Sequence, residues 1–311
     1  MHIASNIIQA IGNTPLVQLR KVVPPDHSRV LVKLEGANPT GSMKDRMAKA
    51  MIEGAEADGR LQPGGTVVES TGGSTGASLA MVCAAKGYRL RIVTSDAFSP
   101  GKRDHMRALG AELTLVSSYN GSFTRELFVT MNEVARQMGE EPGSYWTHQM
   151  NNEDQVAGYH ALGDEIWAQT GGQIDAFVHV VGTGGSIRGS STALRRYDSK
   201  LRVVAVEPAE SPVLSGGEPG AHGIEGIGAG YIVPLWDPIL VDDILTVSTD
   251  EAKEMAQRLA REEGIFAGIS SGANIVAALR VAEQLPQVAT VVTLLIDSGL
   301  KYLSTDLYKE T

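Results

Sequence analysis

The sequence has a single cysteine, Cys83, among 311 residues. One cysteine cannot make an intramolecular disulfide or a multi-cysteine metal cluster, and this scarcity is typical of proteins from a reducing compartment. The neighbours of Cys83 in ASLAMVCAAKG (77–87) are apolar at helical spacing. This pattern favours a buried structural thiol over a reactive one.

The sequence also has no recognisable signal peptide, membrane-spanning segment or block of basic residues. Residues 1–17 contain no cationic stretch followed by a sustained apolar core. No apolar run approaches the ~20 residues that a membrane-spanning helix needs. The formal net charge is −9, and no basic block offsets it, which argues against a phosphate-backbone or anionic-membrane partner. We therefore expect a cytoplasmic protein without nucleic-acid or membrane partners.

The composition that is present is that of a folded globular protein, with 42% hydrophobic and 20% charged residues. Strand-like and helix-like segments alternate, as where TVVES (66–70) precedes TGASLAMVCAAKG (75–87). Such alternation predicts an α/β fold in which parallel sheets are covered by helices. A short polar segment near residues 147–152 separates two such series. We expect two closely packed domains with a cleft between them.

VVGTGGSIRG (180–189) places a glycine-rich turn between a strand and a helix. The backbone N–H groups and the dipole at a helix N-terminus favour an anion. Gly182, Gly184 and Gly185 would let the backbone approach a phosphate closely, and Thr183 and Ser186 add hydroxyl groups. The same glycines could equally serve only a tight turn. The spacing matches neither the dinucleotide-binding nor the P-loop pattern, so no nucleotide is implied.

ESTGGSTGASLA (69–80) is a second junction of the same type, with the hydroxyls of Thr71, Ser74 and Thr75 among three glycines. Two helix N-termini that bind anions suit a ligand with two anionic ends, such as a phosphorylated cofactor joined to an amino-acid carboxylate. A plain glycine turn is again the alternative.

Lys44 lies in NPTGSMKDR (38–46), between a turn and a helix. A lysine can form a Schiff base with a carbonyl compound when burial or nearby positive charge lowers its pKa. From spacing alone, a solvated surface lysine is the better interpretation.

The order of these motifs resembles the cysteine synthase and cystathionine β-synthase family of pyridoxal-phosphate enzymes, which have the tryptophan-synthase-like fold. The similar segments are IGNTPLV (11–17), NPTGSMKDR (38–46), STGGSTG (70–76), GTGGS (182–186), IEGIGAGYIVP (224–234), GISSGA (268–273) and DSGLKYLST (297–305). The resemblance implies two domains, each a mainly parallel sheet flanked by helices, with pyridoxal 5′-phosphate in the cleft between them. Residues 1–40 and 148–311 would form the larger, cofactor-binding domain, and residues 41–147 a smaller mobile domain that carries the substrate loop.

The resemblance also implies a role for each motif. Lys44 would hold the cofactor as a Schiff base and later move the substrate α-proton. The phosphate would be bound by Gly182, Thr183, Gly184, Gly185 and Ser186. The amino-acid substrate would be bound by Thr71, Gly72, Gly73, Thr75, Gln149 and Gly228.

Ser298 matches the residue that faces the pyridine nitrogen of the cofactor. A hydroxyl there leaves this nitrogen largely uncharged, which suits chemistry at the β-carbon better than transamination. The adjacent Asp297 would protonate the nitrogen instead, but neighbouring residues of a strand point to opposite faces.

Three positions depart from the pattern that cysteine synthases usually show. Ser74, which the resemblance implies would contact the cofactor, replaces an asparagine that reaches toward the cofactor's O3′. Gly72 replaces a serine. Glu225 stands where many cysteine synthases have glutamine. These departures leave the substrate and the second nucleophile open.

The resulting hypothesis is a transferase of amino-acid biosynthesis that replaces the β-substituent of an activated serine, such as O-acetylserine, with sulfide or a related nucleophile. A β-elimination lyase such as a cysteine desulfhydrase is the first alternative. A catalytically weak amino-acid-binding or partner-binding protein is the second. The resemblance further implies a homodimer, and we expect no metal site.

Overall fold

The computed structural model describes residues 3–121 and 124–309. Within them the chain forms two compact units. The smaller unit comprises Met1–Ile11 and Asn38–Gln155, and the larger unit comprises Gly12–Ala37 and Val156–Thr311. Each contains a mainly parallel sheet flanked by helices, which confirms the expected α/β fold class. The expected functional division, with a mobile domain at 41–147, stays a prediction.

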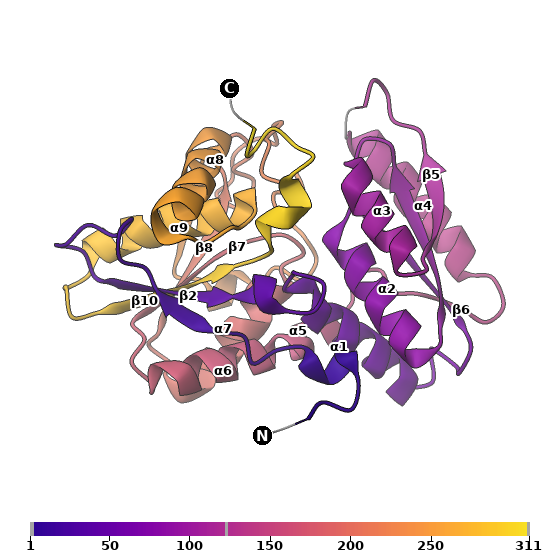
Figure 1. The fold of residues 1–311 in the computed structure, drawn as a ribbon, viewed down its shortest axis with the longest axis horizontal. Helices are drawn as coiled ribbons and strands as arrows, with labels where there is room; N and C mark the ends of the chain where they lie inside the picture. Colours follow the sequence, from indigo (N-terminus) through magenta and orange to yellow (C-terminus); the bar gives the residue numbers. More distant parts are fainter. Residues whose placement is uncertain (1–2, 122–123, 310–311) are drawn as a thin grey trace. The chain divides into compact units, whose positions relative to one another are not determined.

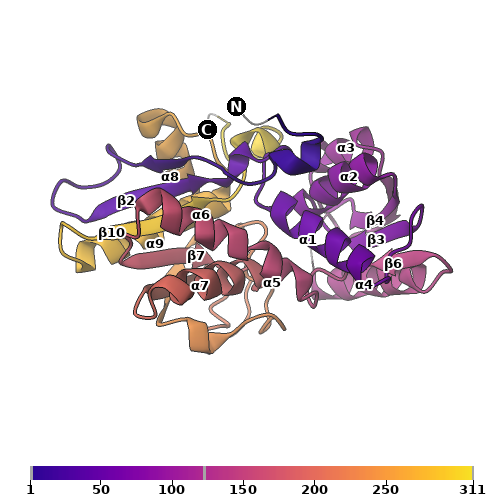
Figure 2. The ribbon, with the colours of Figure 1, turned by 90° about the horizontal axis from the view of Figure 1, so that it is seen from below.

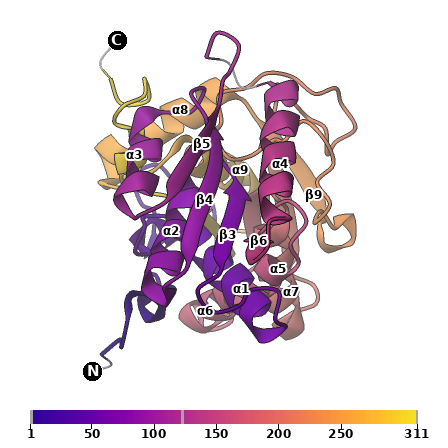
Figure 3. The same ribbon diagram turned by 90° about the vertical axis from the view of Figure 1, so that its right-hand side faces the viewer.

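The smaller unit has a parallel sheet in the strand order β5-β4-β3-β6. Its strands are β3 (Thr66–Ser70), β4 (Arg89–Ser95), β5 (Glu112–Val116) and β6 (Ser144–Trp146). Its helices are η1 (Ile7–Ala10), α1 (Lys44–Ala57), α2 (Ser74–Lys86), α3 (Pro100–Ala108) and α4 (Arg125–Gly139). Figure 3 shows α2 and α3 on one side of this sheet and α4 on the other.

The core of the smaller unit explains this arrangement. Val68 of β3 and Val93 of β4 pack against Leu127, Met131 and Ala135, which recur along one face of α4. All five residues of β3 are buried, as expected for a central parallel strand that is covered on both faces. Helix packing on both faces therefore fixes the strand whose end leads into the predicted substrate loop.

The larger unit has a sheet in the order β1-β2-β10-β7-β8-β9, antiparallel only between β1 and β2. Its strands are β1 (Leu16–Gln18), β2 (Arg29–Leu34), β7 (Ala176–Val180), β8 (Arg202–Pro208), β9 (Asp243–Val247) and β10 (Thr290–Leu295). Its helical elements are η2 (Glu35–Ala37), α6 (His160–Thr170), α7 (Gly185–Tyr197), η3 (Pro238–Leu240), α8 (Thr249–Arg258), η4 (Leu259–Glu263), α9 (Ile269–Gln284) and η5 (Gly299–Tyr302), and α5 (Asp154–Gly158) contains the link between the units.

Helices cover both faces of this second sheet. In Figure 1, α8 and α9 lie on one face of the strands around β10 and β7, and α6 and α7 lie on the other. Figure 2 shows α6 and α7 passing in front of β7. All residues of β7 and β10 are buried, so these strands form the centre of the larger unit.

Both predicted strand-turn-helix junctions are present. β3 is followed within four residues by α2, and β7 is followed within five residues by α7. In open parallel sheets the carboxyl ends of strands are the usual ligand-binding edge. Each unit therefore offers one glycine-rich turn at such an edge.

Cys83 lies inside α2 with 1% of its surface exposed. Burial raises the pKa of its thiol to about 12, which confirms the prediction of a structural rather than a reactive thiol.

Residues 3–121 and 124–309 contain neither a helix that could span a membrane nor a cluster of metal-ligating side chains. Their helices are all too short or too polar to pass through a bilayer. In the same residues, histidine, cysteine and carboxylate side chains nowhere gather in a group of three or more that could bind a metal ion.

Candidate active site

Lys44 is the first residue of α1 and is half-buried. The turn before it is held by the buried carboxylate of Asp45. The Thr40 backbone N–H donates to Asp45 Oδ2 at 2.8 Å, and the hydroxyls of Thr40 and Ser78 donate to Oδ1 at 2.5 and 2.6 Å. A carboxylate in the first turn of a helix is also favoured by the helix dipole. Asp45, which the sequence analysis did not single out, therefore fixes the backbone that carries Lys44.

The predicted substrate loop and Gln149 are in direct contact. The Thr75 hydroxyl donates to Gln149 Oε1 at 2.8 Å, and Gln149 Nε2 donates to the Ser70 carbonyl at 3.0 Å. Within the loop, the Gly73 N–H donates to Thr71 Oγ1 at 3.3 Å. Ser74 is the first residue of α2 and is half-buried. The structure thus brings together the smaller unit's predicted substrate-binding residues, and their binding role stays a prediction.

Glu69, near the end of β3, accepts hydrogen bonds that hold Gln149 and the start of the substrate loop in place. It was not among the residues predicted from the sequence. Its carboxylate accepts hydrogen bonds from the Ser70 N–H at 2.7 Å, the Gln149 N–H at 2.9 Å and the Thr147 hydroxyl at 2.6 Å. Its side chain is buried, and burial raises its pKa to about 7 although these hydrogen bonds oppose the shift. A glutamate within the strand-like segment TVVES was the available signal, because buried carboxylates need partners.

Phe98 fills the space beside Gly72, where cysteine synthases usually have serine. A Cβ atom at Gly72 would lie 2.3 Å from Phe98 Cε1. The ring also packs against the core that joins α4 to β3 and β4. The ring of Phe98 therefore occupies the space that a side chain at position 72 would need.

The glycine-rich turn of the larger unit brings its backbone close to neighbouring backbone. Gly184 has φ +87°, and a Cβ on it would lie 2.9 Å from the Leu235 carbonyl carbon. A Cβ on Gly182 would lie 2.5 Å from the Gly226 carbonyl oxygen. Both positions thus require glycine for steric reasons. The turn leads into the N-terminus of the 13-residue helix α7, whose first N–H groups have no partners within the helix.

Ser298 and Asp297 have different surroundings. The Asp297 side chain is buried, and its Oδ2 accepts a hydrogen bond from the Tyr302 hydroxyl at 3.0 Å. Burial and the nearby Asp297 raise the pKa of Tyr302 well above its ordinary value. Ser298 is half-buried, and its hydroxyl accepts from the Leu300 N–H at 3.3 Å. Ser298 is therefore more exposed than Asp297, and it is the residue of the two that a ligand could contact.

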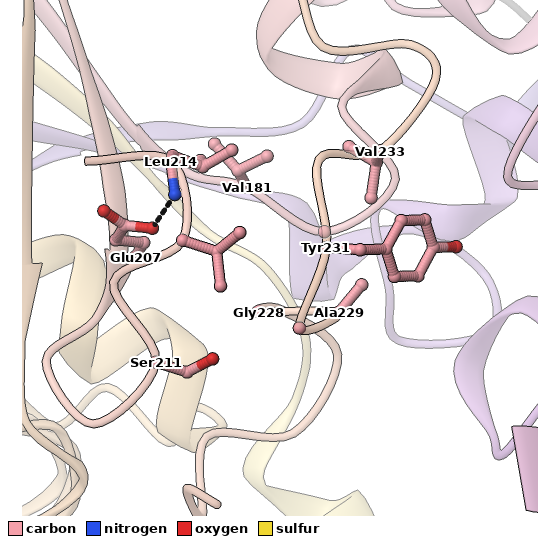
Figure 4. Close-up of a pocket in the computed structure, with 11 residues that line it drawn as sticks. Val181, Glu207, Ser211, Leu214, Gly228, Ala229, Tyr231 and Val233 are labelled. Carbon is pink, nitrogen blue, oxygen red and sulfur yellow. Dashed lines mark hydrogen bonds between the residues drawn. The ribbon is translucent and has the colours of Figure 1, made fainter. Parts of the chain in front are cut away.

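Gly228 lies beside a small pocket of the larger unit (Figure 4). Its φ is +61°, and its N–H donates to the Val181 carbonyl at 3.1 Å. On the opposite side of this pocket, the buried Glu207 accepts a hydrogen bond from the Leu214 N–H at 2.7 Å.

His222 binds the backbone of the segment that contains Gly228. Its Nδ1 accepts from the Ile224 N–H at 3.3 Å, so its Nε2 donates to the Gly228 carbonyl at 3.0 Å. This histidine therefore holds the backbone of the loop in place. Glu225, in the same segment, is exposed.

The residues present fit pyridoxal 5′-phosphate when each unit is considered alone. The turn at 182–186 combines a helix N-terminus, two glycines in close backbone contact and two hydroxyl side chains, which suits a phosphate. A half-buried serine hydroxyl at position 298 suits an uncharged pyridine nitrogen. The half-buried Lys44 supplies the amine that the cofactor's carbonyl group requires.

Comparison with known proteins agrees with this fit. The family described as pyridoxal-phosphate dependent enzyme matches residues 7–297. A cysteine synthase from Staphylococcus aureus is 46% identical over 306 residues, which cover 97% of this chain and 96% of that protein. The crystal structure of cysteine synthase from Entamoeba histolytica has a TM-score of 0.93 at 39% identity and covers 100% of this chain and 92% of that one. A hydrogen sulfide-producing enzyme from Fusobacterium nucleatum has a TM-score of 0.90 at 36% identity, covering 97% and 99%.

These similarities confirm the predicted resemblance, the assignment as an enzyme, the cofactor and β-replacement as the type of reaction. An amino-acid substrate follows from the same similarity. The chain belongs to the pyridoxal-phosphate-dependent enzyme family, as an enzyme of the cysteine synthase type that uses pyridoxal 5′-phosphate.

Proposed function

We propose that the enzyme replaces the β-substituent of O-acetylserine, or of a closely related activated serine, with sulfide to form cysteine. The observation that carries this proposal is the contact between Thr75 and Gln149 at the N-terminus of α2. A helix N-terminus with two adjacent polar side chains is suited to a substrate carboxylate. The cysteine synthases similar to this chain support the choice of sulfide as nucleophile.

Each group of residues then has a defined task. The substrate carboxylate is bound and oriented by Thr71, Gly72, Gly73, Thr75 and Gln149. Gly228 contacts the substrate. The turn at Gly182 to Ser186 binds the cofactor phosphate. The hydroxyl of Ser298 faces the pyridine nitrogen of the cofactor. When bound, pyridoxal 5′-phosphate supplies an electron sink that eases removal of the α-proton.

Lys44 has two tasks, both at its Nζ atom. It holds the cofactor covalently, and it accepts the substrate α-proton and returns a proton to the product. Asp45 holds the first turn of α1 through the hydrogen bonds described above, which keeps Lys44 at a constant position. Ser74 replaces the family's longer asparagine and leaves more room beside the substrate.

β-Elimination is the second candidate function. It is favoured by the similarity to the hydrogen sulfide-producing enzyme of Fusobacterium nucleatum and by the short Ser74 side chain, since a looser site admits water. In that case the amino acid is released as pyruvate and ammonia. The similarity to cysteine synthases favours replacement, and an enzyme over a binding protein.

The products of the purified enzyme distinguish the two functions. The enzyme loaded with pyridoxal 5′-phosphate is incubated with O-acetylserine, serine, phosphoserine or cysteine, each with and without sulfide. We expect cysteine from O-acetylserine and sulfide as the main product. Pyruvate as the main product, with sulfide present, would favour the elimination lyase instead.

We also propose that the enzyme acts as a cytoplasmic homodimer. The dimer rests on family resemblance, and the cytoplasmic location on the single cysteine and on that resemblance. Light scattering at micromolar concentration should give twice the 33.0 kDa mass of the chain. A monomer mass would contradict the proposed assembly.

A further inference from the structure

A buried histidine lies directly behind the phosphate-binding turn. His179 belongs to β7, with 1% of its surface exposed, and its Nε2 lies 2.9 Å from the hydroxyl of Ser186. A serine hydroxyl can donate one hydrogen bond and accept two. Ser186 can therefore donate a hydrogen bond to an anion only if His179 Nε2 donates to the Ser186 oxygen. If Nε2 accepts instead, the Ser186 hydrogen is already used.

Asn274 of α9 determines which nitrogen of His179 carries the proton. Its Oδ1 accepts from the Val180 backbone N–H at 2.8 Å, and its Nδ2 donates to the Leu294 carbonyl at 2.8 Å. A backbone N–H can only donate and a carbonyl can only accept, so these two partners fix the orientation of the amide.

The same amide nitrogen lies 3.3 Å from His179 Nδ1. Because an amide nitrogen only donates, Nδ1 of His179 must be the acceptor. The imidazole is then neutral with its hydrogen on Nε2, and that hydrogen points to Ser186. The Ser186 oxygen accepts this bond, which leaves its own hydrogen to be donated elsewhere.

We propose that Asn274 and His179 form a hydrogen-bond relay that makes Ser186 a dedicated donor to the cofactor phosphate, with His179 as a positioning residue. The inference rests on the proposed role of the turn at 182–186. Donation from His179 polarises the hydroxyl and strengthens the bond that Ser186 gives to an anion. All three side chains are buried, so water does not compete for these bonds.

The opposite arrangement has a different consequence. A histidine with its hydrogen on Nδ1 would take the Ser186 hydrogen through Nε2, and Ser186 could then only accept. A hydroxyl that can only accept repels a phosphate oxygen. The two tautomers therefore predict opposite roles for the Ser186 hydroxyl and different cofactor affinities.

The tautomer is measured directly by ¹⁵N NMR of the full-length protein without cofactor, with histidine labelled in the ring and His179→Gln used for assignment. We expect the shift of a protonated Nε2 and an unprotonated Nδ1 at His179. A protonated Nδ1 would overturn the relay.

Affinity for pyridoxal 5′-phosphate supplies a second, independent measurement. Glutamine reaches as far as Nε2 of histidine and can donate from that place, whereas asparagine is too short. We expect His179→Asn and Ser186→Ala each to weaken binding roughly tenfold, the value of one hydrogen bond to a charged group. His179→Gln should stay within about threefold of wild type.

The double variant His179→Asn with Ser186→Ala should bind no more weakly than Ser186→Ala alone, because His179 acts through Ser186. Additive losses would overturn the relay and indicate a general packing role. If Ser186→Ala weakens binding but His179→Asn does not, the relay is wrong while the phosphate turn stands. If Ser186→Ala has no effect, Ser186 does not donate to the phosphate and the relay is wrong, while the backbone N–H groups of the turn still account for phosphate binding. Thermal unfolding checks that each variant is folded, and His179→Gln together with the tautomer measurement decides the case if His179→Asn is not.

Discussion

The ring of Phe98 occupies the space into which a side chain at position 72 would project, since a Cβ on Gly72 would lie 2.3 to 2.6 Å from three of its ring carbons. A rigid ring that also packs against the core of the smaller unit cannot move aside easily. The glycine and the phenylalanine therefore form a matched pair. Beside position 72 the substrate loop therefore has an aromatic ring and no serine hydroxyl.

The matched pair predicts a strong coupling between the two positions. Gly72→Ser should destabilise the protein by about 1–3 kcal/mol, as overpacking does. In a Phe98→Ala background the same change should cost much less, giving a coupling energy of about 1 kcal/mol or more. Urea unfolding of the four proteins measures it. Gly73→Ser is the control, because its nearest obstacle is the flexible Lys102 side chain. Additive effects at positions 72 and 98 would show that the two residues are independent.

Ser74 is expected to tune the outcome of the reaction. An asparagine amide reaches farther and donates from a fixed plane, whereas a serine hydroxyl is short and rotates. Ser74→Asn should therefore raise the ratio of cysteine to pyruvate by more than it changes cofactor affinity. A difference of ~1.4 kcal/mol between the competing barriers changes this ratio tenfold. An unchanged ratio, with cofactor still bound, would show that the serine is neutral.

Glu69 is expected to make stability depend on pH. Its pKa of about 7 in the folded protein exceeds the ordinary 4.5, so between these values the folded state binds more protons than the unfolded state. Stability must then fall as pH rises through this window, by about 3 kcal/mol in total. Glu69→Gln has no proton to lose there, so its stability relative to wild type should rise between about pH 5 and pH 8.

Urea unfolding at several pH values tests this expectation. Thr147→Val removes a hydrogen bond that lowers the pKa of Glu69, so it should move the transition to higher pH. Parallel pH profiles for wild type and Glu69→Gln would rule out a raised pKa at this carboxyl group.

The sequence predicted those parts of the fold that depend on neighbouring residues. The turns after β3 and β7 could be predicted because a buried strand, a glycine cluster and an apolar helix follow one another directly. Cys83 could be predicted as buried from the helical spacing of its apolar neighbours.

The contacts that support the site could not be predicted, because their partners are far apart along the chain. Asn274 and His179 are 95 residues apart, and Gln149 is 80 residues from Glu69. Nothing in the local pattern of β2 indicates that it pairs with β10. These contacts arise from the order of the strands, which only the folded chain shows.

The most direct test of the account is to locate the cofactor on the chain. The enzyme loaded with pyridoxal 5′-phosphate is reduced with borohydride, digested and analysed by mass spectrometry. We expect one modified peptide, with the phosphopyridoxyl group on Lys44. Lys44→Ala should lack both this peptide and turnover, because alanine cannot bond the cofactor. Modification of another lysine, with turnover retained in Lys44→Ala, would contradict the account.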